Sequence, residues 1–240
     1  MNKEIERILE AYQRIDIRTQ TSALLFGYEN LAHVYRVHER HRETLLLLKE
    51  GGYYPLSKIH ILDVGCGDGV MLRQFLQWGA LPENLAGIEL RSEPVKKAHY
   101  LTPNLDILCG SATDLPYTEA SFDLVCQHTV FTSILDSGMK KRIASEMCRV
   151  LRPGGAVLWY DFMYDNPNNP DVRGIKGAEI ESLFLGLVIR LRRITLAPPI
   201  ARRLPKFGLP VLYPLLASIT FLRTHYLGML VKPNSVKTHG

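Results

Sequence analysis

The segment Ile59–Gly69 reads Ile-His-Ile-Leu-Asp-Val-Gly-Cys-Gly-Asp-Gly, so an apolar run leads directly into a turn of alternating glycines. Glycine has no Cβ, and such positions allow both a tight turn and the close approach of a ligand to the backbone. A helical pattern follows the turn, and the first turn of a helix has free N–H donors. The segment therefore predicts a strand–turn–helix unit of an α/β fold with a ligand site at the turn.

Acidic residues end two of the apolar runs. Asp63 lies two residues before the first glycine of the turn, and Glu89 ends the next run, twenty residues after Gly69. A carboxylate in the site would repel a phosphate, and the glycine spacing is neither that of dinucleotide folds nor that of a P-loop. A positively charged ligand would instead be attracted by the carboxylate of Asp63. S-adenosylmethionine (SAM) is such a ligand, because it carries an ammonium and a sulfonium group. Glu89 can accept hydrogen bonds from both hydroxyls of an adenosine ribose.

Beyond this unit, short β-rich runs alternate with helical stretches. Because the first five expected strands are apolar throughout, they indicate a mostly parallel sheet covered by helices on both faces. The expected strands are 59–64, 85–90, 106–108, 122–127, 156–160, 188–196 and 224–231, and the expected helices between them are 69–78, 93–100 and 138–151. The pattern therefore predicts an α/β fold with a seven-stranded sheet.

The flanking segments follow other patterns. Residues 3–18 and 30–50 have the apolar spacing of amphipathic helices and lie outside the alternation, so they predict a helical cap over residues 1–52, followed by one domain over 53–240. Within that domain, residues 162–222 are expected to hold a substrate-side loop and an insert before the last strand. Helical segments of the insert are predicted to break at Pro205, Pro210 and Pro214.

Composition excludes several classes of protein. The net charge is +5, with basic residues clustered late in the chain, which a solvated face explains better than a nucleic-acid groove. None of the four cysteines forms a CxxC pair, so we expect no metal site. Cysteine usage and the polar N-terminus favour the cytoplasm. No uncharged apolar run reaches the length of about 18 residues that a membrane span needs.

Four stretches in fixed order carry a resemblance to a known family: ILDVGCGDG (61–69), GIEL (87–90), GSATDLPYTEASFDLV (110–125) and EMCRVLRPGGAVLWYDF (146–162). Over about residues 58–162 the chain resembles the class I, Rossmann-like SAM-dependent methyltransferases, in particular the group that acts on small molecules. The resemblance implies a Rossmann-like sheet, SAM as cofactor and S-adenosylhomocysteine (SAH) as product.

The same resemblance implies a role for individual residues. Asp63, Gly65 and Gly67 would hold the methionine end of SAM, Glu89 the ribose, and Leu90 the adenine. Many relatives have Asp where Ser111 stands, and that difference puts one adenine contact in question. The Arg-Pro-Gly-Gly at 152–155 would be the turn before the fifth strand. The full set of cofactor residues implied is Asp63, Gly65, Cys66, Gly67, Asp68, Glu89, Leu90, Ser111, Ala112, Thr113 and Gln127.

Methyl transfer from SAM is an in-line displacement, so positioning can supply much of the catalysis. An alcohol acceptor also needs a general base. His128 is the first candidate, because it ends the fourth strand, where the family transfers the methyl group, and imidazole titrates near neutrality. The alternative is that His128 packs under the cap and only shapes the pocket. Asp161, after the fifth strand, is a second candidate.

Three classes of function remain open. The first is methyl transfer to an O or N atom of a small molecule, such as a natural-product or glycan precursor. The second is modification of a peptide or RNA. RNA is disfavoured because Gln127–Val130 stands where an Asn/Asp-Pro-Pro-Tyr/Phe motif is expected, and no RNA-binding appendage is present. The third is a SAM-binding protein without catalysis. The expected partner is a small-molecule acceptor rather than nucleic acid, and the expected state is a monomer or homodimer.

Overall fold

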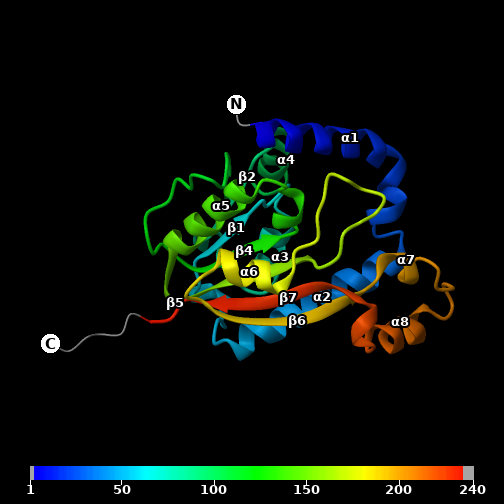
Figure 1. Ribbon diagram of the computed structural model, residues 1–240. Coiled ribbons are helices and arrows are strands. Elements are labelled where there is room, and N and C mark those ends of the chain that lie inside the picture. The colour runs from blue at the N-terminus through cyan, green and yellow to red at the C-terminus, as the bar shows by residue number, and fades with distance from the viewer. Residues whose placement is uncertain (1–2, 235–240) are drawn as a thin grey trace.

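A single seven-stranded sheet organises the molecule (Figure 1). The computed structural model describes residues 3–234, with the side chains of that range except those of 15–26. The strand order is β3-β2-β1-β4-β5-β7-β6, and only β7 runs antiparallel to its neighbours. The strands are β1 (Ile61–Val64), β2 (Leu85–Glu89), β3 (Asp106–Cys109), β4 (Phe122–His128), β5 (Leu151–Phe162), β6 (Val188–Leu196) and β7 (Arg223–Val231). The predicted α/β, Rossmann-like, mostly parallel sheet is confirmed.

Helices cover both faces of this sheet, as the apolar strands predicted. The α-helices are α1 (Lys3–Phe26), α2 (Leu31–Glu50), α3 (Val70–Gln77), α4 (Ser92–Leu101), α5 (Ser137–Val150), α6 (Gly177–Leu183), α7 (Pro198–Ala201) and α8 (Leu209–Ala217). Four short 3-10 helices are η1 (Leu56–Lys58), η2 (Pro82–Asn84), η3 (Phe131–Ser133) and η4 (Thr220–Leu222). One face packs against α2, α3 and α4, and the other against α5 and α6.

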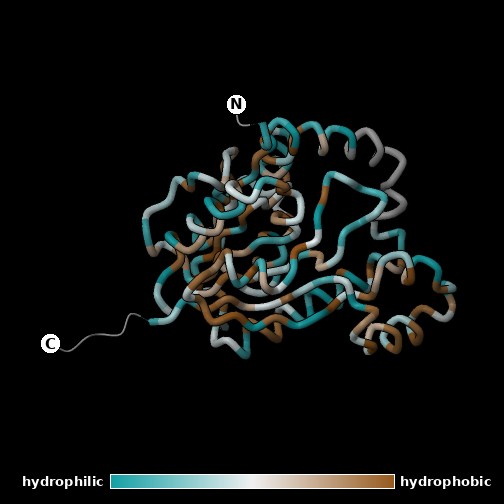
Figure 2. The backbone as a smooth tube through the Cα atoms, in the orientation of Figure 1, coloured by the Kyte–Doolittle hydropathy of each residue, from teal (hydrophilic) through white to brown (hydrophobic). Residues whose placement is uncertain are grey.

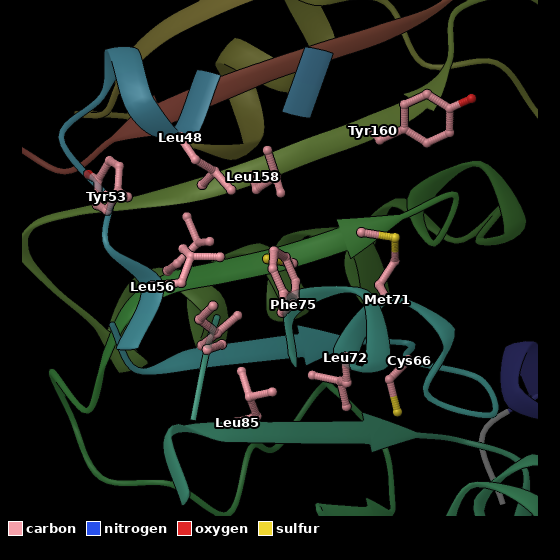
Figure 3. Packing of buried hydrophobic residues seen from close by; sticks show 14 of the residues in the cluster. Leu48, Tyr53, Leu56, Cys66, Met71, Leu72, Phe75, Leu85, Leu158 and Tyr160 are labelled. Atoms are coloured by element: carbon pink, nitrogen blue, oxygen red, sulfur yellow. The ribbon is translucent and has the colours of Figure 1, made fainter. Parts of the chain in front are cut away.

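Each face has its own apolar core. Leu48 of α2 packs against the sheet in the same cluster as Leu72 and Phe75 of α3 (Figure 3). On the opposite face, the ring of Trp159 lies 4.9 Å from that of Phe131, centroid to centroid. Burial of such side chains from water is the main stabilising contribution to a fold of this kind. Because Leu48 belongs to a core shared with the sheet, α2 supports the domain directly; the division at residue 52 stays a prediction.

Two local predictions are wrong. The Arg-Pro-Gly-Gly at 152–155 lies inside β5, where the pairing with β4 shifts register and Gly154 has φ +78°, so the expected turn is a bulge in a longer strand. The helix α8 continues through Pro214. Pro214 removes the N–H that would bond to the carbonyl of Pro210. Both prolines are exposed, so water can bond to that carbonyl instead.

The order of the strands places a cleft at one edge of the sheet. The chain leaves β1 toward β2 and β3 and then returns to β4 on the other side of β1. Ligands of open α/β sheets bind outside the carboxyl ends of the strands at such a reversal. Because β6 is parallel to β1–β5, the insert after β6 also begins at this edge. Within residues 3–234, no helix is long and apolar enough to cross a membrane.

Candidate cofactor cleft and catalytic residues

A cavity opens at the carboxyl ends of β1, β2 and β4, where the strand order reverses. It encloses about 630 Å³, including the part open to solvent, which is the size of a small-molecule site. Strand ends, the segment after β3, the segment after β4, α1 and α5 supply its walls. The residues that line it are Ile8, Tyr12, Val64, Gly65, Ile88, Glu89, Leu90, Arg91, Gly110, Ser111, Ala112, His128, Thr129, Val130, Ser133, Ile134, Met139 and Ile143.

The glycine turn after β1 forms the base of the cleft. Gly65 and Gly67 both have positive φ, +69° and +57°, which glycine adopts without strain. The N–H groups of Gly65 and Cys66 donate to the carbonyl of Ile88 at 2.8 and 3.1 Å, so the turn is fixed to the end of β2. A Cβ on Gly65 would lie 2.5 Å from Cγ2 of Val130, whereas one on Gly67 would meet nothing within 4 Å. The turn therefore packs closely at Gly65 and leaves room for a ligand at Gly67.

Glu89 lies beside this turn, as the sequence predicted. Its Oε2 accepts a hydrogen bond from the Gly67 N–H at 3.0 Å, and its Oε1 accepts from the backbone N–H and the Nε of Arg91, each at 3.0 Å. Each carboxylate oxygen has two lone pairs, so Oε2 can accept one further hydrogen bond from a ligand. The carboxylate is therefore held in place by the protein and faces the cleft.

Arg91 is a cleft residue that the sequence reasoning missed. Its guanidinium pairs with Glu89, and its Cζ lies 4.0 Å from the ring centroid of Tyr12 in α1. A cation over an aromatic face at this distance is attracted by the ring electrons. The available signal was an arginine two residues after the acidic strand end. Arg91 thus joins the Glu89 carboxylate to the helix that covers the cleft.

The helix α1 is fixed over the cleft by polar contacts near its start. Oε1 of Glu4 accepts from the backbone N–H groups of Leu135 and Asp136 at 2.6 and 3.3 Å. Arg7 donates to the carbonyl of Ser133 at 2.6 Å. These contacts hold Tyr12, which lies on the same helix, against the cleft.

Asp63 and His128 meet at the inner end of the cleft. Oδ1 of Asp63 lies 3.5 Å from Nδ1 of His128, and both side chains are almost fully buried. Among the described residues, neither this oxygen nor either ring nitrogen of His128 has a hydrogen-bond partner. Polar atoms left without partners in a buried place are costly, so they point to a bound group that would satisfy them. His128 lines the cleft itself, and Asp63 lies behind it.

The residue after His128 has an unusual backbone. Thr129 has φ +60°, which is a genuine outlier for a β-branched residue. Its N–H donates to the carbonyl of Tyr160 in β5 at 2.8 Å, and its Oγ1 donates to the carbonyl of His128 at 2.7 Å. Backbone strain of this kind persists where the surrounding structure imposes it, and it gathers at functional sites. The bonds to β5 therefore fix the turn that presents His128 to the cleft.

Asp161 lies away from the cleft. It is fully buried and accepts hydrogen bonds from Oγ1 and N–H of Thr132, at 2.6 and 3.2 Å, and from the N–H of Phe162 at 2.9 Å. Burial raises the pKa of Asp161 to about 7, although these hydrogen bonds act in the opposite direction. The carboxyl group thus fixes η3 to β5 and does not line the cavity.

Asp161 should make stability depend on pH. Its folded-state pKa is raised above the ordinary 3.8, so the bound proton stabilises the fold at low pH, and this contribution is lost as the pH rises through about 7. We expect the free energy of unfolding to fall by roughly 2–3 kcal/mol more from pH 5 to pH 8 in the wild type than in Asp161→Asn. Urea titrations of both proteins at several pH values measure this difference. Parallel pH profiles would contradict it.

The other residues of the predicted cofactor set divide into two groups. Leu90, Ser111 and Ala112 line the cleft. The second group supports it from outside. The Cys66 thiol packs in the core, and a Cβ on Gly87 would lie 2.8 Å from its Sγ. The remaining support contacts are those of Asp68 with Lys97 at 2.6 Å, of Thr113 with the Ser111 hydroxyl at 2.8 Å, and of Gln127 with the Val130 N–H at 3.1 Å.

No group of three metal-ligating side chains occurs among the residues that the structure describes. The groups near the strand ends are a carboxylate that accepts a hydrogen bond from the glycine turn, an apolar wall beside it, and an Asp–His pair at the inner end. Such an arrangement can hold a nucleoside at one end and accept a proton at the other.

Comparison with known proteins finds similarity to methyltransferases. Residues 62–159 match a family model described as a methyltransferase domain. The chain is 29% identical over 162 residues to 24-methylenesterol C-methyltransferase 2 of Oryza sativa subsp. japonica, covering 63% of this chain and 41% of that protein. It is 36% identical over 107 residues to glycine/sarcosine/dimethylglycine N-methyltransferase of Actinopolyspora halophila, covering 43% and 18%. The chain thus spans less than half the length of both relatives.

Solved structures share the fold. The crystal structure of the [4+2]-cyclase SpnF matches with a TM-score of 0.58 and 18% sequence identity, over 81% of each chain. At this identity the likeness describes the arrangement of the elements alone.

Proposed function

We propose that this chain, which resembles the class I SAM-dependent methyltransferases and matches a methyltransferase-domain model over residues 62–159, transfers the methyl group of SAM to an oxygen or nitrogen atom of a small molecule and releases SAH. One observation carries the proposal. The cleft that holds Glu89 near the glycine turn also ends at Asp63 and His128, whose buried polar atoms have no hydrogen-bond partner among the described residues. A cofactor site and a proton acceptor thus lie in one cavity.

The residues of the cleft fit SAM. The open space at Gly67 leaves room for a ligand beside the turn. Oε2 of Glu89 would accept from a ribose hydroxyl, and the apolar wall at Leu90 and Ala112 would contact the adenine. Oδ1 of Asp63, which has no hydrogen-bond partner among the described residues, lies behind the inner end, and its negative charge would lower the free energy of a cation bound there. When bound, SAM supplies a methyl group already activated by a sulfonium.

His128 would act as the general base. An acceptor O–H or N–H placed against its free ring nitrogen would give up its proton as the new bond to carbon forms. Asp63, 3.5 Å from Nδ1, would stabilise the resulting imidazolium and hold the ring's orientation. The Thr129 turn keeps the ring at the strand end. Asp161, which is buried under η3, receives a positioning role in this proposal.

The proposal that the acceptor atom is oxygen or nitrogen, rather than carbon, depends on this base. The printed names of the two relatives include a C- and an N-methyltransferase, so similarity to them does not select the acceptor atom. A carboxylate-paired histidine suits an acceptor that carries an acidic proton on a heteroatom.

The proposal is tested by calorimetric titration with SAH, followed by transfer of radiolabelled methyl groups from SAM to a panel of alcohols, phenols, amines, carbon acceptors, a peptide and RNA. We expect SAH to bind and at least one heteroatom acceptor to be labelled. Absence of SAH binding would refute the cofactor site. Labelling confined to carbon acceptors, to peptide or to RNA would refute the acceptor class.

Glu89→Ala should weaken SAH binding about tenfold, because a charged hydrogen-bond acceptor for the ribose is lost. Glu93→Ala is the matched control, since Glu93 is an exposed carboxylate on α4 that pairs with Lys96. Calorimetry measures both variants. Equal affinity of Glu89→Ala and the wild type would contradict the ribose assignment.

A second candidate function has one observation in its favour. The matching structure of SpnF is titled a [4+2]-cyclase, so this fold also occurs in a protein named for a reaction other than methyl transfer. A SAM-binding protein that catalyses no methyl transfer would bind SAH and label no acceptor in the assay above.

A further inference from the structure

The insert between β6 and β7 has an unusual surface. It begins at the carboxyl end of β6 and contains α7 and α8. One side of α8 is buried through Leu209, Tyr213 and Ala217, which pack in a small core with Ala32 of α2 and Leu196 of β6. The insert is therefore a folded part of the domain, and its outer side is formed by specific residues.

The outer side of α8 is apolar. Val211 and Leu215 are 70% and 60% exposed, and they lie four residues apart on one face of the helix, with the exposed Pro210 and Pro214 beside them. Phe207 precedes the helix and is 92% exposed, and Phe221 follows it and is 74% exposed. A surface helix ordinarily turns charged or polar residues to water. In α8 no residue is charged, and Figure 2 shows the segment mostly in the colours of apolar residues.

Basic residues lie next to this apolar patch. Arg202, Arg203 and Lys206 are exposed in the turn between α7 and α8, and within the described part of the chain none of them forms an ion pair. Glu181 is the last acidic residue of the sequence, so the whole of β6, the insert and β7 carries positive charge alone. The insert thus has exposed apolar side chains on and around α8 and exposed cations in the turn that leads into it.

We propose that the insert docks on the surface of an anionic lipid bilayer, with Phe207, Val211, Leu215 and Phe221 in the headgroup region and Arg202, Arg203 and Lys206 against the headgroups. Segments with an apolar face and flanking cations bind in this way, lying in the interface without crossing it. Each cation near an anionic surface adds to the attraction. The proposal stands apart from the catalytic one, because it uses none of the cleft residues.

A second copy of the chain suits the patch less well. In a twofold dimer the same surface meets itself. No acidic residue follows Glu181, so Arg202, Arg203 and Lys206 of one copy would find no carboxylate in the insert of the other copy. Charge complementarity therefore favours a lipid surface.

Flotation with vesicles tests the proposal. Wild-type protein is mixed with vesicles of phosphatidylcholine alone, or of equal parts phosphatidylcholine and phosphatidylglycerol. We expect binding to the anionic vesicles at least about tenfold above binding to the neutral ones, with loss at high salt. The double variant Val211→Asp/Leu215→Asp should lose about tenfold or more, because two apolar contacts become charged and repel the surface.

Leu185→Asp is the matched control. Leu185 is 81% exposed but lies before the amino end of β6, at the opposite edge of the sheet from the insert. The control should bind anionic vesicles like the wild type, and the SAH affinity of all variants should equal that of the wild type. Equal losses in the control and the double variant, equal binding to both vesicle types, or no binding would each overturn the proposal. So would a dimer in light scattering that the double variant abolishes.

Discussion

His128→Ala should lower kcat by about 100-fold or more and leave the SAH affinity nearly unchanged. A positioned general base contributes about 10² to 10⁴ in rate. His128 lines the cleft at the end of β4, and both of its ring nitrogens are without partners among the described residues. Removing the ring should therefore cost the proton transfer more than the cofactor contacts. Single-turnover measurements with a heteroatom acceptor report the chemical step directly.

The control for this variant is His38→Ala, because His38 is an exposed histidine of α2 outside the cleft. Added imidazole should restore part of the rate of His128→Ala, since a small base can enter the space that the ring leaves. A purely structural His128 would give losses of similar size in kcat and SAH affinity, without rescue. That result would remove the base from the mechanism and leave the cofactor site standing.

Gly65→Ala should reduce SAH affinity at least about tenfold and also destabilise the fold. At φ +69° a side chain costs roughly 1–2 kcal/mol in backbone energy alone. The new Cβ would also lie 2.5 Å from Cγ2 of Val130, so Val130 or the turn must shift. Both residues line the cleft, and a shift of either changes its shape. Calorimetry and thermal unfolding measure the two effects.

Gly52→Ala separates the backbone cost of a positive φ from the cost of a steric clash. Gly52 has φ +79°, and a Cβ there would meet nothing within 4 Å, so the variant carries the backbone cost without the clash. We expect it to lose stability and to bind SAH like the wild type. Val130→Ala combined with Gly65→Ala should recover part of the affinity. Equal binding by Gly65→Ala and Gly52→Ala would show that close packing at the turn has no part in binding.

The sequence identified those parts of the fold that local patterns determine. The strands β1 and β2 and the turn between β1 and α3 were predicted closely, because apolar runs and glycines act locally. The bulge at 152–155 was missed, since Arg-Pro-Gly-Gly suits a turn by itself, and only pairing with β4 and β7 makes it strand. The continuation of α8 through Pro214 likewise depends on the core that Tyr213 and Ala217 enter.

The candidate site shows the same division. Gly65 and Glu89 were predicted from their motifs, and the structure brings both to one cleft. The sequence did not predict which of two neighbouring residues at a strand end faces the cleft. Along a strand, successive residues point to opposite faces. Gln127 therefore bonds within the core while His128 faces the cleft. Arg91 was missed because its role depends on Tyr12, a partner from a helix far away in sequence.

The polar contacts that hold α1 over the cleft have a thermodynamic consequence. Any ligand that gains free energy from Tyr12 binds more tightly when α1 is docked, and by reciprocity it strengthens the docking by the same amount. The amide protons of Leu135 and Asp136, which donate to Glu4, are released to water whenever the start of the helix lifts. Their exchange with deuterium therefore reports the fraction of molecules in which the start of α1 is lifted. The factor by which saturating ligand slows this exchange gives the coupling free energy between helix docking and ligand binding.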